Sequence, residues 1–157
     1  MPTFSAAQRV AFALGAFFFA GFALADQPSP RLDLKPGQEI AFAVTVADGR
    51  VSLGPARPVK PGGAEPKEGE IAVAVVKHGL SPYADLTATE KTSQPVDFVA
   101  TGLIGDIKID EIVVCGRLDA PAIARIASGS WRVSLNRFAV RPKAGAPTSE
   151  GGLGCPR

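Results

Sequence analysis

The sequence predicts an all-β fold: an antiparallel β-sandwich of about seven or eight strands, preceded by an N-terminal signal segment. Short apolar stretches alternate with polar residues at the period of two that is typical of strands. Glycine and proline turns separate these stretches, and almost none of the chain has helical periodicity. We prefer an immunoglobulin-like arrangement, with a small barrel as the alternative.

The N-terminal residues 1–25 have the order of a secretory signal. Arg9 is followed by 15 uncharged residues that end near Ala25, where cleavage is expected. This run is shorter than the about 20 residues that a membrane-spanning helix needs, although a retained anchor is the alternative. We therefore expect residues 26–157 to form one periplasmic or secreted domain, with no stable membrane insertion after cleavage.

A hairpin is expected near the start of this domain, after an extended, proline-containing lead-in. Residues 38–54 alternate, and the residues that share one face are Ile40, Phe42, Val44 and Val46. Asp48 and Gly49 predict a two-residue turn between two strands. Residues 55–69 contain four prolines and three glycines, which predict a flexible loop.

Strands are expected along most of the remaining chain, at residues 70–78, 83–91, 96–103, 107–118 and 130–142. Slips in the apolar phase predict one bulge near Asp110 and another near Asn136. Trp131 is expected on the same face as the apolar residues that follow it. Residues 120–129 are compatible with a helical turn, and also with an irregular connection.

The two cysteines, Cys115 and Cys155, suit an oxidising compartment. They do not form a Cys-x-x-Cys pair, so a structural disulfide is preferred over free or catalytic thiols. A bridge closing a loop of about 40 residues would stabilise the fold by about 4 kcal/mol in the chain-entropy model. It would also fix the C-terminal tail to the strand that carries Cys115.

The only histidine, His78, is followed closely by Ser81 and Asp85, which raises the question of a hydrolase triad. Pro82 removes the backbone N–H that often donates to an oxyanion after the nucleophile, and no Gly-x-Ser-x-Gly motif is present. We therefore expect no catalytic residues here. The stretch is predicted to be a hairpin with His78 and Tyr83 facing each other at its mouth.

No metal or cofactor site is expected. One histidine and a bonded cysteine pair leave no set of zinc ligands. Asp106, Asp110 and Glu111 could bind calcium, but a strand would separate the two aspartates by about 13 Å. The stretch also lacks the glycine-centred loop of a dedicated calcium site. The formal net charge of +2 does not predict a nucleic-acid partner.

Basic residues concentrate toward the C-terminus, as Arg117, Arg125, Arg132, Arg137, Arg141 and Lys143. One interpretation is an anion-binding face for a cell-wall polymer or a lipid headgroup. The preferred interpretation is that these bases pair across the sheet with the acids between Asp85 and Glu111.

Small residues form the second face of two strands, at Ala41, Ala43, Ala72 and Ala74. An exposed sheet face usually carries longer polar side chains, so we expect either a loop of the domain or a partner to cover this one.

These patterns favour a non-enzymatic, exported β-sandwich module that binds a protein or a cell-envelope polymer. A structural or assembly accessory subunit that acts by strand addition is the alternative. A small hydrolase built on the His78 hairpin ranks third.

Overall fold

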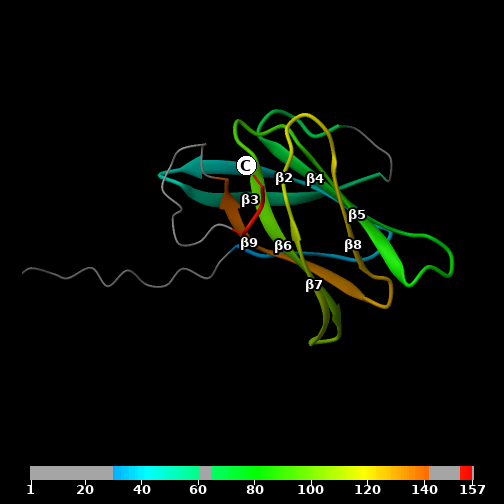
Figure 1. Cartoon of the computed structure of the whole chain (residues 1–157). Helices are drawn as coiled ribbons and strands as arrows, with labels where there is room; N and C mark the ends of the chain where they lie inside the picture. The colour runs from blue at the N-terminus through cyan, green and yellow to red at the C-terminus, as the bar shows by residue number, and fades with distance from the viewer. Residues whose placement is uncertain (1–29, 61–64, 142–152, 157) are drawn as a thin grey trace, which may run out of the picture.

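The computed structural model describes residues 30–60, 65–141 and 153–156, and within these ranges the chain forms nine strands and no helix (Figure 1). The strands are β1 (Leu32–Leu34), β2 (Glu39–Ala47), β3 (Arg50–Val59), β4 (Glu70–Lys77), β5 (Tyr83–Glu90), β6 (Val96–Ile104), β7 (Ile107–Val114), β8 (Ala122–Ala127) and β9 (Arg132–Val140). Because no helix occurs in the described ranges, none there could cross a membrane. The expected signal segment lies outside them.

The strands form two antiparallel sheets, as expected for a sandwich-like fold rather than a small barrel. One sheet has the order β1-β9-β6-β7, and the other has the order β3-β2-β4-β5-β8. Neighbouring strands pair antiparallel throughout both sheets. The strands β7 and β8, each at the edge of its own sheet, lie along the same side of the molecule (Figure 1).

The core lies between the sheets and includes three phenylalanines. Phe42 from the five-stranded sheet and Phe98 from the four-stranded sheet are both fully buried. The ring of Phe138 stacks on Phe98 at a centroid distance of 5.3 Å and meets Phe42 edge-on at 5.8 Å. A register shift in β9 next to Asn136, with Arg137 at a φ of 49°, changes the phase of the strand before Phe138. The predicted bulge is therefore confirmed, and it allows Phe138 to pack inward.

Two other local predictions are confirmed. Asp48 and Gly49 connect β2 to β3 with φ angles of 51° and 72°, the positive values of a tight hairpin turn. In the β6–β7 hairpin, Gly102 pairs with Asp110 whereas the next residue pairs with Lys108, which leaves Ile109 in a bulge. This bulge adjoins Asp110, where the phase slip in the sequence placed it.

The proline-rich segment differs from expectation at its start. Residues 55–59, expected in a loop, continue β3 and pair with β2, where Pro58 lies opposite Ile40. β3 has only one neighbour, so a proline can face the open side without removing a bond from the ladder. The edge position of β3, which cannot be read from local sequence, explains the difference.

Two further corrections concern the stretch before β9. Residues 122–127, expected as a helical turn or an irregular connection, form the strand β8 and pair with β5. Long-range pairing thus overrides a weak local pattern. Trp131, expected to face the core, is 69% exposed because it precedes β9 in the turn that follows β8.

Candidate functional site

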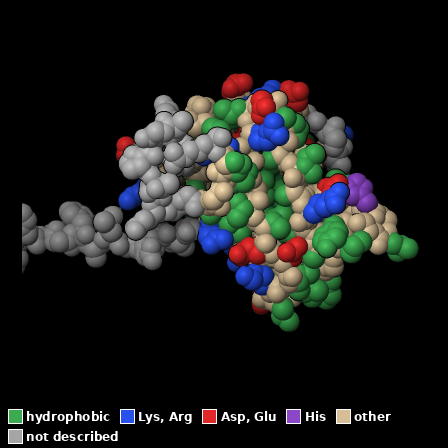
Figure 2. Space-filling model, viewed as in Figure 1, with side chains coloured by type: hydrophobic (Ala, Val, Ile, Leu, Met, Phe, Trp, Pro, Cys, Tyr) green, Lys and Arg blue, Asp and Glu red, His purple; other side chains and the backbone are tan. Residues whose placement is uncertain are grey.

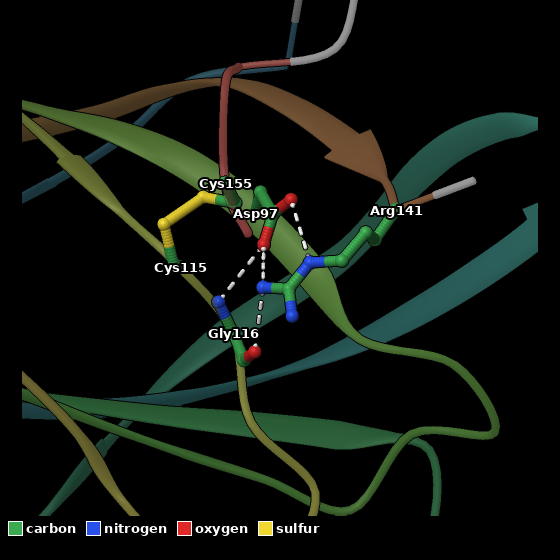
Figure 3. Close-up of a disulfide and its surroundings, with 5 residues drawn as sticks. All are labelled: Asp97, Cys115, Gly116, Arg141 and Cys155. Atoms are coloured by element: carbon green, nitrogen blue, oxygen red, sulfur yellow. Dashed lines mark hydrogen bonds and ion pairs between the residues drawn. A yellow bond between two sulfur atoms is a disulfide. The ribbon is translucent and has the colours of Figure 1, made fainter. Parts of the chain in front are cut away.

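The predicted disulfide is present between Cys115 and Cys155, and it fixes the C-terminal segment next to β7 (Figure 3). Beside it lies Asp97, a buried carboxylate on β6. Asp97 Oδ1 accepts hydrogen bonds from Gly116 N at 3.0 Å and from Arg141 Nη2 at 2.6 Å. The Arg141 guanidinium also donates to Gly116 O at 2.8 Å. This group joins β6, the segment after β7 and the end of β9, which indicates a structural role.

A second buried carboxyl, Glu90, lies at the same end of the core and was not anticipated from the sequence. Glu90 is 4% exposed. Its Oε2 accepts a hydrogen bond from Val96 N at 3.1 Å, whereas its Oε1 has no partner among the described residues. Burial raises the pKa of Glu90 to about 7, and the negative charge of Asp97 adds to the increase. The bond from Val96 N and the charge of Arg141 oppose it.

Gly116 provides the space that this carboxyl occupies. A Cβ at Gly116 would lie 2.5 Å from Glu90 Oε1 and 2.7 Å from Glu90 Oε2, closer than real Cβ contacts. It would also collide with Val96 O. Glycine is thus required here for a close approach rather than for a special backbone angle.

The His78 stretch forms the predicted hairpin. His78 follows β4 and Tyr83 begins β5, one step beyond the last strand pair, Lys77 and Ala84, so the two residues lie on either side of the hairpin mouth as predicted. The polar partner of His78 is Asp85, with Nε2 and Oδ2 3.0 Å apart at an exposed position. Ser81 Oγ accepts a hydrogen bond from Tyr83 N at 3.2 Å, which stabilises the turn. None of these contacts joins the serine hydroxyl to the imidazole.

Each of the five described C-terminal arginines lies near a carboxylate. The pairs are Arg117–Asp119, Arg125–Asp85, Arg132–Asp106, Arg137–Glu111 and Arg141–Asp97. Four of these acids belong to the expected acidic stretch, in agreement with the preferred interpretation of pairing. The structure distributes the five arginines over both sheets and a connection. Lys143 lies outside the described residues.

The small-residue face is only partly open. Ala41 and Ala72 are paired across β2 and β4 on the face away from the core, and both are buried. Ala74 is half-buried and Ala43 is exposed. Ala41 and Ala72 therefore cannot belong to an open partner surface in this structure.

A contact between the two neighbours of β2 contributes to this burial. Arg57 on β3 lies opposite Ala41, and Glu70 on β4 lies opposite Ala43. The Arg57 guanidinium donates to Glu70 Oε2 at 2.7 Å, so this ion pair passes over β2 on the face of the alanines. Side chains of the domain itself thus lie over the middle of this face.

Exposed apolar side chains concentrate along the side of the molecule formed by β7 and β8. We name this surface the apolar flank, and its members are Ile107, Ile109, Val113, Leu118, Ile123 and Trp131. Ile123 is 70% exposed, about as much as the tryptophan. In the space-filling view, hydrophobic side chains gather over the lower ends of β7 and β8 (Figure 2).

Two shallow depressions lie on the described surface. One, of about 310 Å³, is formed by residues 36–39 and 74–77. The other, of about 420 Å³, lies between the end of β7 and the start of β8, and Val113, Arg117 and Ile123 contribute to its walls. Neither of these two depressions includes His78, Ser81 or Asp85 among its lining residues.

One cluster of metal-ligand residue types occurs within the described ranges, consisting of Asp97, Cys115 and Cys155. Its two sulfur atoms are bonded to each other and cannot act as thiolate ligands. Two of the acids that were considered for calcium have other partners: Asp106 pairs with Arg132, and Asp110 Oδ2 accepts a hydrogen bond from Ala127 N at 2.7 Å.

Comparison of the chain with protein-family models, curated proteins and solved structures gave no match.

Proposed function

We propose that the protein is a non-enzymatic, exported module that binds another protein through its apolar flank. The immunoglobulin-like type of the sandwich and the periplasmic or extracellular location belong to the same proposal. The presence of the Cys115–Cys155 disulfide is compatible with such a compartment.

The exposure of large apolar side chains along β7 and β8 carries this proposal. Soluble monomers rarely expose many such side chains on one side, and surfaces of this kind frequently contact another macromolecule. Trp131 is of the residue type that contributes most often to the centre of protein interfaces. Two arginines lie beside the flank, Arg117 in the same depression as Val113 and Ile123 and Arg125 on β8, and arginine is another common interface residue.

The geometry of the His78 hairpin supports the proposal that the protein is not an enzyme. An enzyme needs polar groups that converge on a cleft, whereas a binding module needs an open patch or an open edge. His78 and Asp85 form an exposed pair, and the hydroxyl of Ser81 is engaged with the backbone of its own turn. These contacts favour a local structural role for all three.

A capture experiment with two valine variants tests the flank. Val113 lies on the flank and Val76 lies on β4, with exposed fractions of 41% and 44%. The exported protein, Val113→Ser and Val76→Ser would each be crosslinked in a periplasmic extract, and the captured proteins compared by mass spectrometry. We expect Val113→Ser to lose at least about tenfold of a specific partner, equivalent to about 1.4 kcal/mol, and Val76→Ser to retain it. Equal capture by both variants, or retention on a polymer alone, would contradict the proposal.

A further inference from the structure

Three turns lie together at one end of the molecule, and they connect β4 to β5, β6 to β7 and β8 to β9. These turns are residues 78–82, 105–106 and 128–131. Backbone hydrogen bonds join them, since Ser128 N donates to Pro82 O at 2.9 Å and Trp131 N donates to Leu103 O at 2.8 Å. Figure 1 shows the three turns following one another from the right to the bottom of the view. We name these turns, with the strand residues next to them, the turn end.

Each of the three turns presents a large apolar side chain to solvent. Leu80 in the first turn is fully exposed, Ile107 directly follows the second, and Trp131 ends the third, with Ile107 as exposed as Trp131. Tyr83, next to the first turn, is half exposed and adds a second aromatic ring. Hydrophobic side chains gather in the same region of the space-filling view (Figure 2). Turns usually carry small and polar residues, so these apolar side chains indicate a contact surface.

The shape and the residue types of the turn end suit a lipid bilayer. Its apolar side chains stand on three separate turns, and a protein partner would need a surface shaped to fit all of them. The boundary layer of a bilayer is fluid and takes up protruding apolar side chains without such a fit. Trp131 and Tyr83 are of the two residue types that are enriched at membrane–water boundaries, because each combines an apolar ring with a polar N–H or O–H group.

The charges near the three turns limit the depth and the lipid selectivity of such a contact. Basic and acidic side chains occur there in nearly equal numbers, as Lys77, Lys108, Arg125, Arg132, Asp33, Asp85, Asp106 and Asp110. Near neutrality gives little preference for anionic over neutral lipid. Asp106 lies in the second turn, where it pairs with Arg132 at 3.3 Å. A charge in this position is costly in hydrocarbon, so the contact stays at the level of the lipid headgroups.

We propose that the turn end binds reversibly to the surface of a lipid bilayer, with Leu80, Ile107 and Trp131 entering at the level of the headgroups. The burial of apolar surface drives this contact, and attraction between opposite charges adds little. The inference goes beyond the proposed protein-binding function and does not depend on it. Ile107 and Trp131 of the apolar flank would contact the bilayer, and the part of the flank around the depression of about 420 Å³ would remain free for the partner.

Trp131 is the only tryptophan of the chain, so its fluorescence reports directly on this contact. The exported protein with its disulfide formed would be mixed with vesicles of phosphatidylcholine, and with vesicles of equal parts phosphatidylcholine and phosphatidylglycerol. With both we expect a blue shift of the emission, quenching by brominated acyl chains, and affinities that differ by less than about threefold. Unchanged emission with both vesicles would overturn the inference. Binding to anionic vesicles alone, abolished by about 0.5 M salt, would also overturn it.

Two double variants of matched chemistry locate the contact. Leu80→Ser with Ile107→Ser changes the turn end, whereas Leu118→Ser with Ile123→Ser changes the same two residue types at the other end of the apolar flank. We expect the first variant to lower vesicle affinity at least about tenfold, and the second to keep it within about twofold. All four side chains are exposed, so both variants should stay folded, which circular dichroism would check. Equal losses of vesicle affinity would overturn the assignment to the turn end.

Partner capture separates this inference from the proposed function. Suppose that the wild type does not bind vesicles, and that Leu80→Ser with Ile107→Ser loses the captured protein in an extract freed of membranes. The turn end then belongs to the protein interface, and the bilayer inference fails. If vesicles shift the Trp131 emission while Val113→Ser retains the captured protein, the bilayer inference stands and the protein-binding proposal fails.

Discussion

Replacing Glu90 by glutamine should change how the stability of the domain depends on pH. The carboxyl is buried, one of its oxygens has no partner among the described residues, and burial raises its pKa from the ordinary value of 4.5 to about 7. The folded state binds this proton more tightly than the unfolded state does. The contribution of the proton to the free energy of unfolding therefore decreases as pH rises. The contribution of Glu90 to stability is complete below about pH 4.5, and it is lost as pH increases through about 7.

The size of the effect follows from the difference between the two pKa values. A difference of about 2.5 units corresponds to about 3 kcal/mol between the fully protonated and fully ionised limits. Between about pH 5 and pH 8 the wild type should therefore lose about 2 to 3 kcal/mol relative to Glu90→Gln. The glutamine resembles the protonated carboxyl in shape and does not titrate. Its amide can change the absolute stability, but it cannot change this pH-dependent difference.

Urea denaturation followed by Trp131 fluorescence and by circular dichroism would measure the difference. Both proteins would be compared at several pH values, with Glu68→Gln as a control because Glu68 is exposed. The charged groups that act on Glu90 are Asp97 and Arg141, and both stay in place in all three proteins. Parallel stability curves for the wild type and Glu90→Gln would refute the argument that the buried carboxyl is protonated in the folded state.

Three further predictions concern the disulfide, the covered face and the hairpin. Cys155→Ser should lower the free energy of unfolding by about 4 kcal/mol, measured by urea denaturation under non-reducing conditions; an unchanged midpoint would contradict it. Ala41→Glu should destabilise the fold by at least about 2 kcal/mol because it buries a charge, while Ala43→Glu at an exposed position should have little effect on thermal unfolding. Equal melting temperatures of these two variants would show that Ala41 is not covered in the folded domain. His78→Ala should change the free energy of unfolding by less than about 1 kcal/mol, because its pair with Asp85 is exposed, and partner capture by less than about tenfold; a larger loss of capture in a folded variant would contradict this expectation.

Local signals in the sequence were sufficient for much of the fold. Alternation located most strands, and Asp48-Gly49 located a hairpin because both residues tolerate positive φ angles. The cysteine pair allowed only one intramolecular bridge. Phase slips located two bulges, since a bulge adds one residue to one strand and thereby exchanges its two faces.

The features that could not be predicted depend on long-range neighbours. β8 is short and becomes a strand through its pairing with β5, and Pro55 and Pro58 are accommodated because β3 is an edge. The Arg57–Glu70 ion pair, which contributes to the burial of Ala41, joins the two neighbours of β2, and it could be predicted only from the strand order.

The buried carboxyl did leave a signal. Ala84, Leu86 and Ala88 face the core from β5, and Glu90 is the next residue in that phase. Continuing the alternation by one step would have placed this acid inside the sandwich. The burial of Asp97 was harder to predict, because alternation places its side chain on the face of β6 that points away from the core. Its burial depends on Arg141 and on the segment that carries Cys155.

The position of the disulfide has a mechanical consequence. The covalent loop from Cys115 to Cys155 spans a sequence separation of 40 residues and contains both β8 and β9. When tension is applied between the two ends of the chain, the load passes from Cys155 through the sulfur atoms to Cys115 and enters the sheet at the end of β7. β8 and β9 are bypassed, so about 140 Å of chain stays out of the extension under load. This part of the chain stays out of the extension even after β5 and β6, the sheet partners of β8 and β9, have been pulled apart.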